Sequence, residues 1–291
     1  MSRFAIVSDS TVNLPPEYAK TSDIVIMPLV VHWGGESYLD GVNIDAETFY
    51  TRLRTSKDFP STSQPSPGEF MAFLEKVAEE KQTDTILGVI VSSEMSGTFS
   101  SAVQAQTMLA ESRPDLRIEL VDSRCVSIPL GFQAMAAERA RNAGMTIEET
   151  IEVVKRREAS THTIFAVDTL EFLHRGGRIG GAARLLGSAL QLKPVLTFAD
   201  GRIEPLEKVR SRTKSLKRLI EIVEERLNGR QPKELGYVHA EADADLVRLR
   251  AMVDERWTPE ATYTVVMTPV VGTHGGPGTL GIAFYAEDDL P

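Results

Sequence analysis

The sequence contains a single cysteine, Cys125, in 291 residues. An internal disulfide and a thiolate metal cluster are therefore excluded, and the apolar neighbours of Cys125 predict that it is a small buried hydrophobe. No apolar run is long enough to cross a bilayer; the longest, 23–32 and 263–271, have about half the required length. Residues 1–9 enter a strand pattern at once, so we expect no signal peptide and a cytoplasmic protein.

A positive net charge is also lacking. The formal charge of −9 argues against general nucleic-acid binding. Basic residues nevertheless concentrate between positions 174 and 218, where eleven Lys and Arg stand against three Asp and Glu. This stretch is interpreted either as a solvated basic face or as a docking surface for an anionic partner, such as another protein or a nucleotide.

Several motifs of cofactor binding are missing or weak. The chain has no Gly-x-x-x-x-Gly-Lys-Ser/Thr phosphate loop, so we do not expect it to bind ATP alone in that manner. The glycine-rich segment 176–181 does not clearly follow a strand, which makes it a poor dinucleotide fingerprint. The segment 239–245 alternates acidic residues with alanine, but acidic residues also favour the first turn of a helix, and no metal site is predicted there.

The length predicts two domains. Residues 1–158 alternate strands with helices, which indicates an α/β/α domain with a parallel sheet covered on both faces. Ser66, Pro67 and Glu69 form the signature of a helix start with a capping box. The expected strands are 4–8, 24–31, 84–91 and 116–122, and the expected helices are 45–53, 66–80, 98–111 and 130–142.

Residues 159–291 have a different pattern. The pair Asp200-Gly201 with apolar flanks predicts a hairpin. Hairpins mixed with helices indicate a second α/β domain with a mixed sheet and helices mainly on one face. The expected strands are 161–167, 195–198, 202–209 and 234–239, and the expected helices are 212–227 and 243–255.

The segment 272–281 holds five glycines in ten residues, with His274 as its only imidazole. Glycine permits close approach of the backbone to a ligand, and Pro277 restricts the segment. We therefore predict a rigidly based loop, held by a strand at 263–267, in which His274 faces a ligand.

Hydroxyl-rich segments follow three expected strands or loops, at 8–11, 60–67 and 92–98. Hydroxyls and free N–H groups at the carboxyl ends of parallel strands can form an anion site, although Ser and Thr also serve simply as helix caps. Ser96 with His274 as base would make a nucleophile pair, but the Gly-x-Ser-x-Gly elbow of hydrolases is absent around Ser96.

Taken together and in this order, six segments resemble the DegV family of bacterial fatty-acid-binding proteins, and the resemblance extends from residue 8 to about 281. It implies a fatty-acid tunnel between two domains. The matching segments are Ser8-Asp9-Ser10-Thr11, Thr62 to Pro67, Ser92 to Phe99, Asp168 to Ile179, Asp200 to Arg210 and Gly272 to Thr279.

The resemblance further implies a role as the acyl-carrying subunit of a fatty acid kinase. In this role the chain has no catalysis, metal or cofactor of its own, and a separate ATP-binding subunit converts the bound carboxylate to an acyl phosphate for phospholipid synthesis. By motif position, Thr62, Ser96 and His274 would hold the carboxyl group, and Arg178 and Arg210 would face the kinase subunit. Candidates for lining the tunnel are Met95, Phe99, Phe172 and Leu280.

Two alternatives stay open from the residues alone. The first is an autonomous hydrolase or transferase that uses Ser96 and His274, and the second is a fatty-acid-responsive regulator or store. The energetics suit a binder, because burying about fifteen methylenes at about 0.8 kcal/mol each supplies on the order of 12 kcal/mol.

Overall fold

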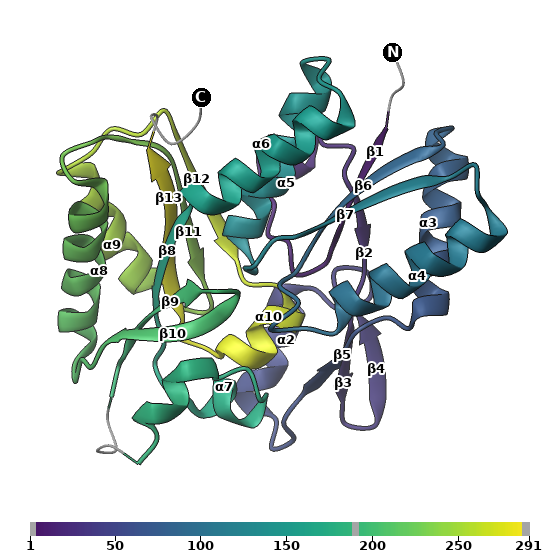
Figure 1. The fold of residues 1–291 in the computed structure, drawn as a ribbon. Helices are drawn as coiled ribbons and strands as arrows, with labels where there is room; N and C mark the ends of the chain where they lie inside the picture. The colour runs from purple at the N-terminus through teal and green to yellow at the C-terminus, as the bar shows by residue number, and fades with distance from the viewer. Residues whose placement is uncertain (1–3, 188–191, 287–291) are drawn as a thin grey trace.

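The computed structural model describes residues 4–187 and 192–286. Three groups of residues lie outside these ranges: 1–3 of the expected N-terminal strand segment, 188–191 of the basic stretch and 287–291 of the expected C-terminal domain. Two large sheets stand side by side, with a small third sheet below the first (Figure 1).

The N-terminal sheet is fully parallel and has the strand order β2-β1-β6-β7. Helices α3 and α4 pack together against it, and so do α5 and α6, which confirms the expected parallel α/β architecture. The strands are β1 Ala5–Asp9, β2 Val25–Met27, β6 Thr85–Ile90 and β7 Arg117–Asp122. The helices are α1 Pro16–Ala19, α3 Pro67–Lys81, α4 Thr98–Ser112, α5 Ile128–Asn142 and α6 Ile147–Ser160.

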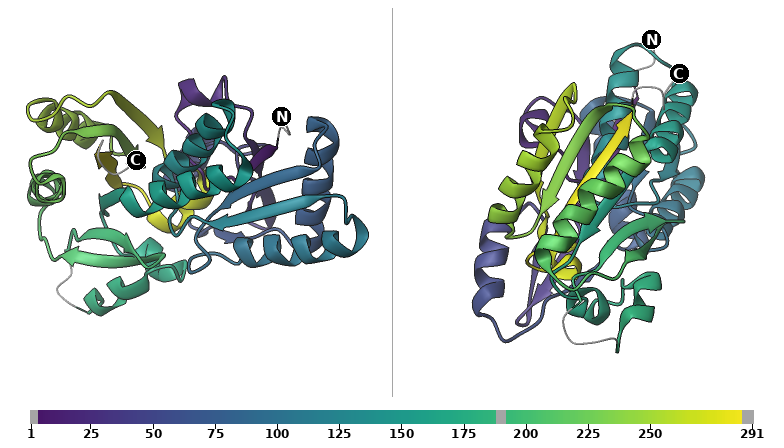
Figure 2. Two further views of the ribbon diagram at one scale, coloured as in Figure 1. Left: turned by 45° about the horizontal axis from the view of Figure 1, so that its top comes forward. Right: turned by 90° about the vertical axis from the view of Figure 1, so that its left-hand side faces the viewer.

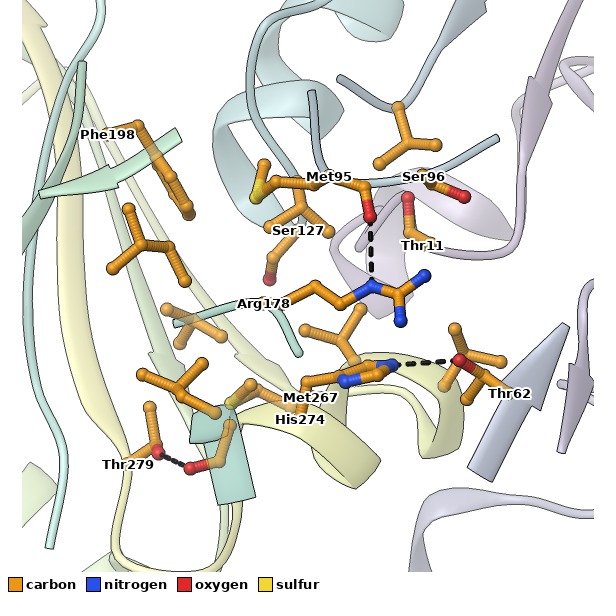
Figure 3. A pocket seen from close by; sticks show the side chains of 18 of the residues that line it. Thr11, Thr62, Met95, Ser96, Ser127, Arg178, Phe198, Met267, His274 and Thr279 are labelled. Atoms are coloured by element: carbon orange, nitrogen blue, oxygen red, sulfur yellow. Dashed lines mark hydrogen bonds between the residues drawn. The ribbon is translucent and has the colours of Figure 1, made fainter. Parts of the chain in front are cut away.

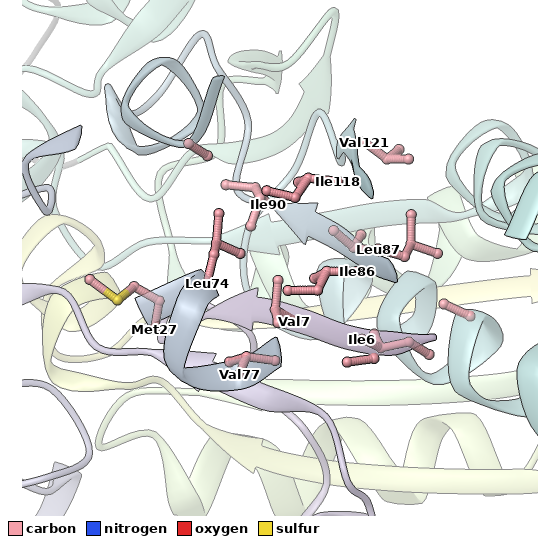
Figure 4. Close-up of a cluster of buried hydrophobic side chains, with 14 of the residues drawn as sticks. Ile6, Val7, Met27, Leu74, Val77, Ile86, Leu87, Ile90, Ile118 and Val121 are labelled. Atoms are coloured by element: carbon pink, nitrogen blue, oxygen red, sulfur yellow. The ribbon is translucent and has the colours of Figure 1, made fainter. Parts of the chain in front are cut away.

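The core of this half is built by strands that are buried on both faces (Figure 4). Ile6, Ile86 and Leu87 have no exposed surface, and Leu74 of α3 packs among them. Burial on both faces explains why these strands appear as continuous apolar runs in the sequence. Cys125 is buried in the same cluster, as expected.

The expected strand 24–31 is divided in two, and this corrects the sequence prediction. Strand β2 ends at Met27, and after Pro28, which has no N–H to donate, the chain enters β3 (Val30–Trp33). Strand β3 pairs antiparallel with β4 (Glu36–Leu39) and β5 (Ser61–Ser63) in the third sheet, which was not predicted. Helix α6, with a capping box of Thr146 and Glu149, was also not predicted.

The C-terminal sheet is mixed, with the order β10-β9-β8-β13-β11-β12. Only the pair β11 and β12 is parallel. Helices α8 (Arg212–Leu227) and α9 (Asp243–Asp254) cover one face, as Figure 2 shows, which confirms the expected mixed domain. The strands are β8 His162–Ala166, β9 Val195–Ala199, β10 Arg202–Glu207, β11 Pro232–His239, β12 Ala261–Val266 and β13 Leu280–Ala286.

Local sequence signals account for one hairpin turn and for the start of one helix. Asp200 and Gly201 both have positive φ (49° and 75°) and connect the antiparallel strands β9 and β10, so the predicted hairpin is confirmed. The capping box of Ser66 and Glu69 at the start of α3 is confirmed as well. The remaining elements are α2 Ala46–Thr55, α7 Glu171–Arg175, the 3-10 helix η1 Gly180–Leu185 and α10 Pro269–Gly275.

A buried amide joins the two halves of the molecule. Asn13 donates to the carbonyl of Val266 at the end of β12 (2.8 Å) and accepts from the Ser127 hydroxyl (2.6 Å). The division into 1–158 and 159–291 stays a prediction; position 158 lies in the last turn of α6, and all strands after it belong to the six-stranded sheet.

We expect the substitution Asn13→Ala to lower the free energy of unfolding by about 1–3 kcal/mol, because it leaves the buried Ser127 hydroxyl and the partly buried Val266 carbonyl without this partner. Urea unfolding followed by circular dichroism measures the change. Asn43→Ala is the matched control: Asn43 accepts one exposed backbone hydrogen bond that water can replace, so its effect should stay within about 0.5 kcal/mol. Equal effects of the two substitutions on the free energy of unfolding would contradict a stabilising role of the Asn13 hydrogen bonds.

Candidate functional site

A cavity lies between the two large sheets, closed below by β5 and α10 (Figure 3). Its volume is about 930 Å³ including its open mouth. Most of its wall is apolar, and the apolar side chains come from both halves of the chain. They are Leu29, Val91, Met95, Val126, Pro129, Phe165, Leu173, Phe198, Ile203, Val238, Met267, Val270 and Val271.

Polar side chains gather at one end of this cavity. His274 lies there at the end of helix α10, and its Nε2 is 2.8 Å from the hydroxyl of Thr62 on β5. The prediction that all of 272–281 is a loop was wrong: Thr268 and Pro269 begin a short helix that continues to Gly275, and the turn that follows uses Gly276 (φ 74°) and Gly278 (φ 80°). His274 lines the cavity, and that it faces a ligand stays a prediction.

Arg178 lies across the same end of the cavity. Its Nε donates to the Met95 carbonyl (3.0 Å) and its Nη1 to the Gly176 carbonyl (2.8 Å). A Cβ on Gly176 would lie 2.1 Å from His274 Nδ1, so glycine is what lets this segment pass over the imidazole. The resemblance implied a docking role for Arg178, but the side chain is half-buried in the cavity wall.

Burial and charge both keep the His274 ring neutral. Burial, and after it the neighbouring Arg178 cation, lower the pKa of His274 to about 4. Its Nδ1 is buried and has no partner among the described residues. Arg178 is thus the charged group of this polar cluster.

Ser96 also lines the cavity, but it is not hydrogen-bonded to His274. Its hydroxyl bonds to the Thr98 hydroxyl (2.9 Å) and accepts from the Thr98 N–H (3.3 Å) at the start of α4. Figure 3 shows the Arg178 side chain extending between Ser96 and His274. The arrangement therefore lacks the nucleophile–base contact of a serine hydrolase.

Of the four predicted tunnel-lining residues, the structure places only Met95 in the cavity wall. Phe99 packs on the core of the N-terminal half, and Leu280 is fully buried in the core beneath α8 and α9. Phe172 packs against Gly276 and stacks on Phe59, with ring centroids 4.9 Å apart. Phe99 and Phe172 lie in helices α4 and α7 and Leu280 begins β13, and each side chain packs on neighbouring protein instead of the cavity.

Other wall residues were missed by sequence reasoning. Thr163 and Phe165 on β8 both line the cavity, whereas Ile164 packs in the core on the other face. The period-two alternation of a strand is the signal that could have found them. Phe198 on β9 and Met267 after β12 gave no comparable signal.

Most of the basic stretch is neutralised by ion pairs. Among the described residues, Arg178, Lys208, Arg210 and Lys214 form no ion pair with a carboxylate, and Arg210 is exposed. The solvated-face interpretation therefore explains most of the stretch. The paired residues are Arg175, Arg184, Lys193, Arg202, Arg212, Lys217 and Arg218.

The fold and the site define an α/β ligand-binding protein with an apolar chamber that is polar at one end. A model of the DegV family of uncharacterised proteins matches residues 3–287. The chain therefore belongs to the DegV family, as the resemblance indicated. A DegV domain-containing protein of Streptomyces coelicolor is 37% identical over 284 residues, which is 97% of this chain and 98% of that one.

Two solved structures share the fold over nearly their whole length. A DegV family protein of Thermus thermophilus, described as binding fatty acid, superposes with a TM-score of 0.88 at 31% identity, covering 98% of this chain and 99% of that one. DegV of Bacillus subtilis, described as a fatty acid binding protein, has a TM-score of 0.86 at 30% identity, covering 99% and 100%.

The described residues also bear on two other features, a membrane-spanning helix and a metal site. Across residues 4–187 and 192–286, no helix is long and apolar enough to cross a membrane. In the same part of the chain, no group of three or more His, Cys, Asp or Glu side chains is placed to hold a metal ion.

We expect the His274 ring to stay neutral until the pH falls to about 4, as an NMR titration of its ring protons can show. A histidine of the unfolded chain takes up its proton near pH 6.5, so His274 contributes stability above about pH 6.5 that is lost as the pH falls toward 4. The His274→Gln variant should lose this part of the pH dependence. An imidazole that titrates near pH 6.5 in the folded protein would contradict the assignment.

Proposed function

We propose that this protein binds one long-chain fatty acid in the cavity and presents its carboxylate to a separate ATP-dependent kinase subunit, which converts it to an acyl phosphate. The single observation that carries the proposal is the apolar chamber with a polar cluster confined to one end. The fatty-acid-binding structures of Thermus thermophilus and Bacillus subtilis support it.

The acyl chain supplies most of the binding energy. About fifteen methylenes contribute on the order of 12 kcal/mol at about 0.8 kcal/mol each, from which the costs of immobilising the ligand are subtracted. A wall of Phe165, Phe198 and Met267 suits an unbranched chain because it offers few polar groups along its length.

The polar end suits a carboxylate. Thr62 and Ser96 bring hydroxyl donors, and Arg178 brings one positive charge, whose Nη2 has no hydrogen-bond partner among the described residues. One cation offsets one carboxylate, and the neutral His274 leaves the site without a second positive charge. In this proposal Arg178 therefore stabilises the ligand charge, in addition to the contact with the kinase that the resemblance implies.

The chemistry requires a second subunit. The chain lacks a phosphate loop for ATP, whereas a carboxylate oxygen held at the cavity mouth can attack the γ-phosphate of ATP bound to a partner. The acyl phosphate that results hydrolyses readily, and an enclosed tail protects it during transfer. Arg210 is exposed and forms no ion pair among the described residues, which favours it as the docking residue for the kinase.

The two alternatives differ in their support. The hydrolase or transferase hypothesis is disfavoured because Ser96 bonds to Thr98 and His274 bonds to Thr62, rather than to each other. A fatty-acid-responsive regulator or store would use the same cavity, and only turnover with a kinase distinguishes it from the carrier subunit.

The first test is mass spectrometry of the organic extract of protein that has never been delipidated, and one equivalent of a long-chain fatty acid is expected.

We expect Thr62→Val to weaken binding by about tenfold, because it removes one hydroxyl from the carboxylate site. Thr21→Val is the control, since Thr21 is exposed and bonds only to a local carbonyl. A clean extract, with no uptake of added palmitate, would refute fatty-acid binding.

We expect Arg210→Glu to abolish acyl phosphate formation in the presence of a fatty acid kinase subunit while palmitate still binds, because it reverses a charge on the docking surface. Formation of acyl phosphate is measured as hydroxamate after trapping with hydroxylamine. Arg248→Glu, on the exposed face of α9, should retain turnover. Loss of palmitate binding in the Arg210 variant would show that the residue serves the lipid site instead.

A further inference from the structure

A second, polar chamber adjoins the far end of the apolar cavity. Pro129, Thr163 and Phe198 line both, so the two spaces share a wall. In Figure 3 Phe198 lies on the opposite side of the apolar cavity from Thr62. The polar chamber is therefore where the end of the acyl chain remote from the carboxylate would arrive. Its volume is about 480 Å³ including its opening.

A half-buried guanidinium faces this polar chamber. Arg226 of α8 forms no ion pair among the described residues, and its contacts within hydrogen-bond range are to the Thr197 hydroxyl, at 3.4 and 3.5 Å. Burial lowers the pKa of Arg226, and the nearby Glu225 carboxylate offsets only part of that shift. Such a group gains from an oxygen that accepts its N–H bonds.

A buried acceptor lies in the same chamber. Gln133 is 1% exposed and uses its Nε2 to donate to the Ser123 carbonyl (2.9 Å) and toward the Cys125 sulfur (3.2 Å). Its Oε1 has no partner among the described residues. An amide oxygen accepts and cannot donate, so it requires a donor from outside the protein.

Arg226 needs an acceptor and Gln133 needs a donor, and together these needs indicate which chemical group of a ligand fits the chamber. A hydroxyl group accepts from Arg226 and donates to Gln133 at once, whereas a carboxylate could serve only the first. The Glu158 carboxyl also lines the chamber, and Arg124, 3.5 Å away in the same wall, offsets its charge. Asp200 is likewise paired with Arg124, at 3.0 Å.

We propose that the preferred ligand is a long-chain fatty acid with a hydroxyl group at or near its methyl end, held there by Arg226 and Gln133. The inference rests on the proposed function, because it assumes that the carboxylate occupies the Thr62 end. The chain end passes the Phe198 side chain to reach the polar chamber, and Phe198 is partly exposed in the wall that the chambers share.

The test compares three ligands on the delipidated full-length protein by competition native mass spectrometry: hexadecanoic acid, 16-hydroxyhexadecanoic acid and hexadecanedioic acid. We expect the hydroxy acid to bind more tightly than hexadecanoic acid, and the diacid to bind more weakly than the hydroxy acid. Arg226→Met keeps the apolar stem but removes the donors, so it should weaken the hydroxy acid by about tenfold or more and leave hexadecanoic acid within about twofold. Lys217→Met, exposed on the same helix, is the control and should change neither.

Each outcome decides the proposal. A wild-type protein that binds the hydroxy acid no more tightly than hexadecanoic acid would overturn it, because an apolar tunnel end penalises an unpaired hydroxyl. A preference for the diacid, or an unchanged ratio in the Arg226 variant, would also overturn it. Binding of hexadecanoic acid to the variant shows that it is folded. Failure of all three ligands to bind the wild type would refute the proposed function itself.

Discussion

The rim of the cavity depends on one buried carboxylate, that of Asp9. It ends β1 and accepts three hydrogen bonds, from the Thr11 N–H (2.9 Å), the Thr11 hydroxyl (2.6 Å) and the Val91 N–H just beyond β6 (2.7 Å). Burial raises the pKa of Asp9, and these donors oppose that shift. Because the same carboxylate fixes the exits of two neighbouring strands, the segments that carry Thr11 and Ser96 leave the sheet in a defined direction and line the cavity.

Sequence signals predicted the elements whose structure is set locally. Helix α3 begins at its Ser66 capping box, α8 runs from Arg212 to Leu227, and the Asp200-Gly201 turn forms its hairpin. The errors lie where tertiary pairing decides. Residues 24–31 have the composition of one strand, but β2 and β3 pair in different sheets on either side of Pro28. Helix α10 contains two glycines and two valines, and no propensity favours it; its packing against α7 and α2 does.

The residues of the site were predicted from the sequence less completely than the helices and strands. The resemblance named Thr62 and His274, which the fold brings together from positions 212 residues apart in the chain, and such a contact has no local signature. The placement of Arg178 inside the cavity could not be read from the sequence, since it follows from the passage of Gly176 over the imidazole. The lining was predicted poorly because an apolar residue at the start of a helix or strand, such as Phe99 or Leu280, gives no indication of which surface it faces; the alternation of β8 does.

The cavity wall combines two kinds of interaction, and both halves of the molecule contribute apolar side chains to it. The N-terminal strand exits and β5 provide hydroxyls, which orient a ligand through directional hydrogen bonds, whereas β8 and β9 provide Phe165 and Phe198, which bind through non-directional burial. His274 and Arg178 belong to the second half in sequence but lie among the groups of the first, since α10 and the segment after α7 reach across. Affinity for an acyl ligand therefore depends on how the halves are joined. The buried amide of Asn13, which bonds to Val266 across the halves and accepts from the cavity-lining Ser127, is one such link.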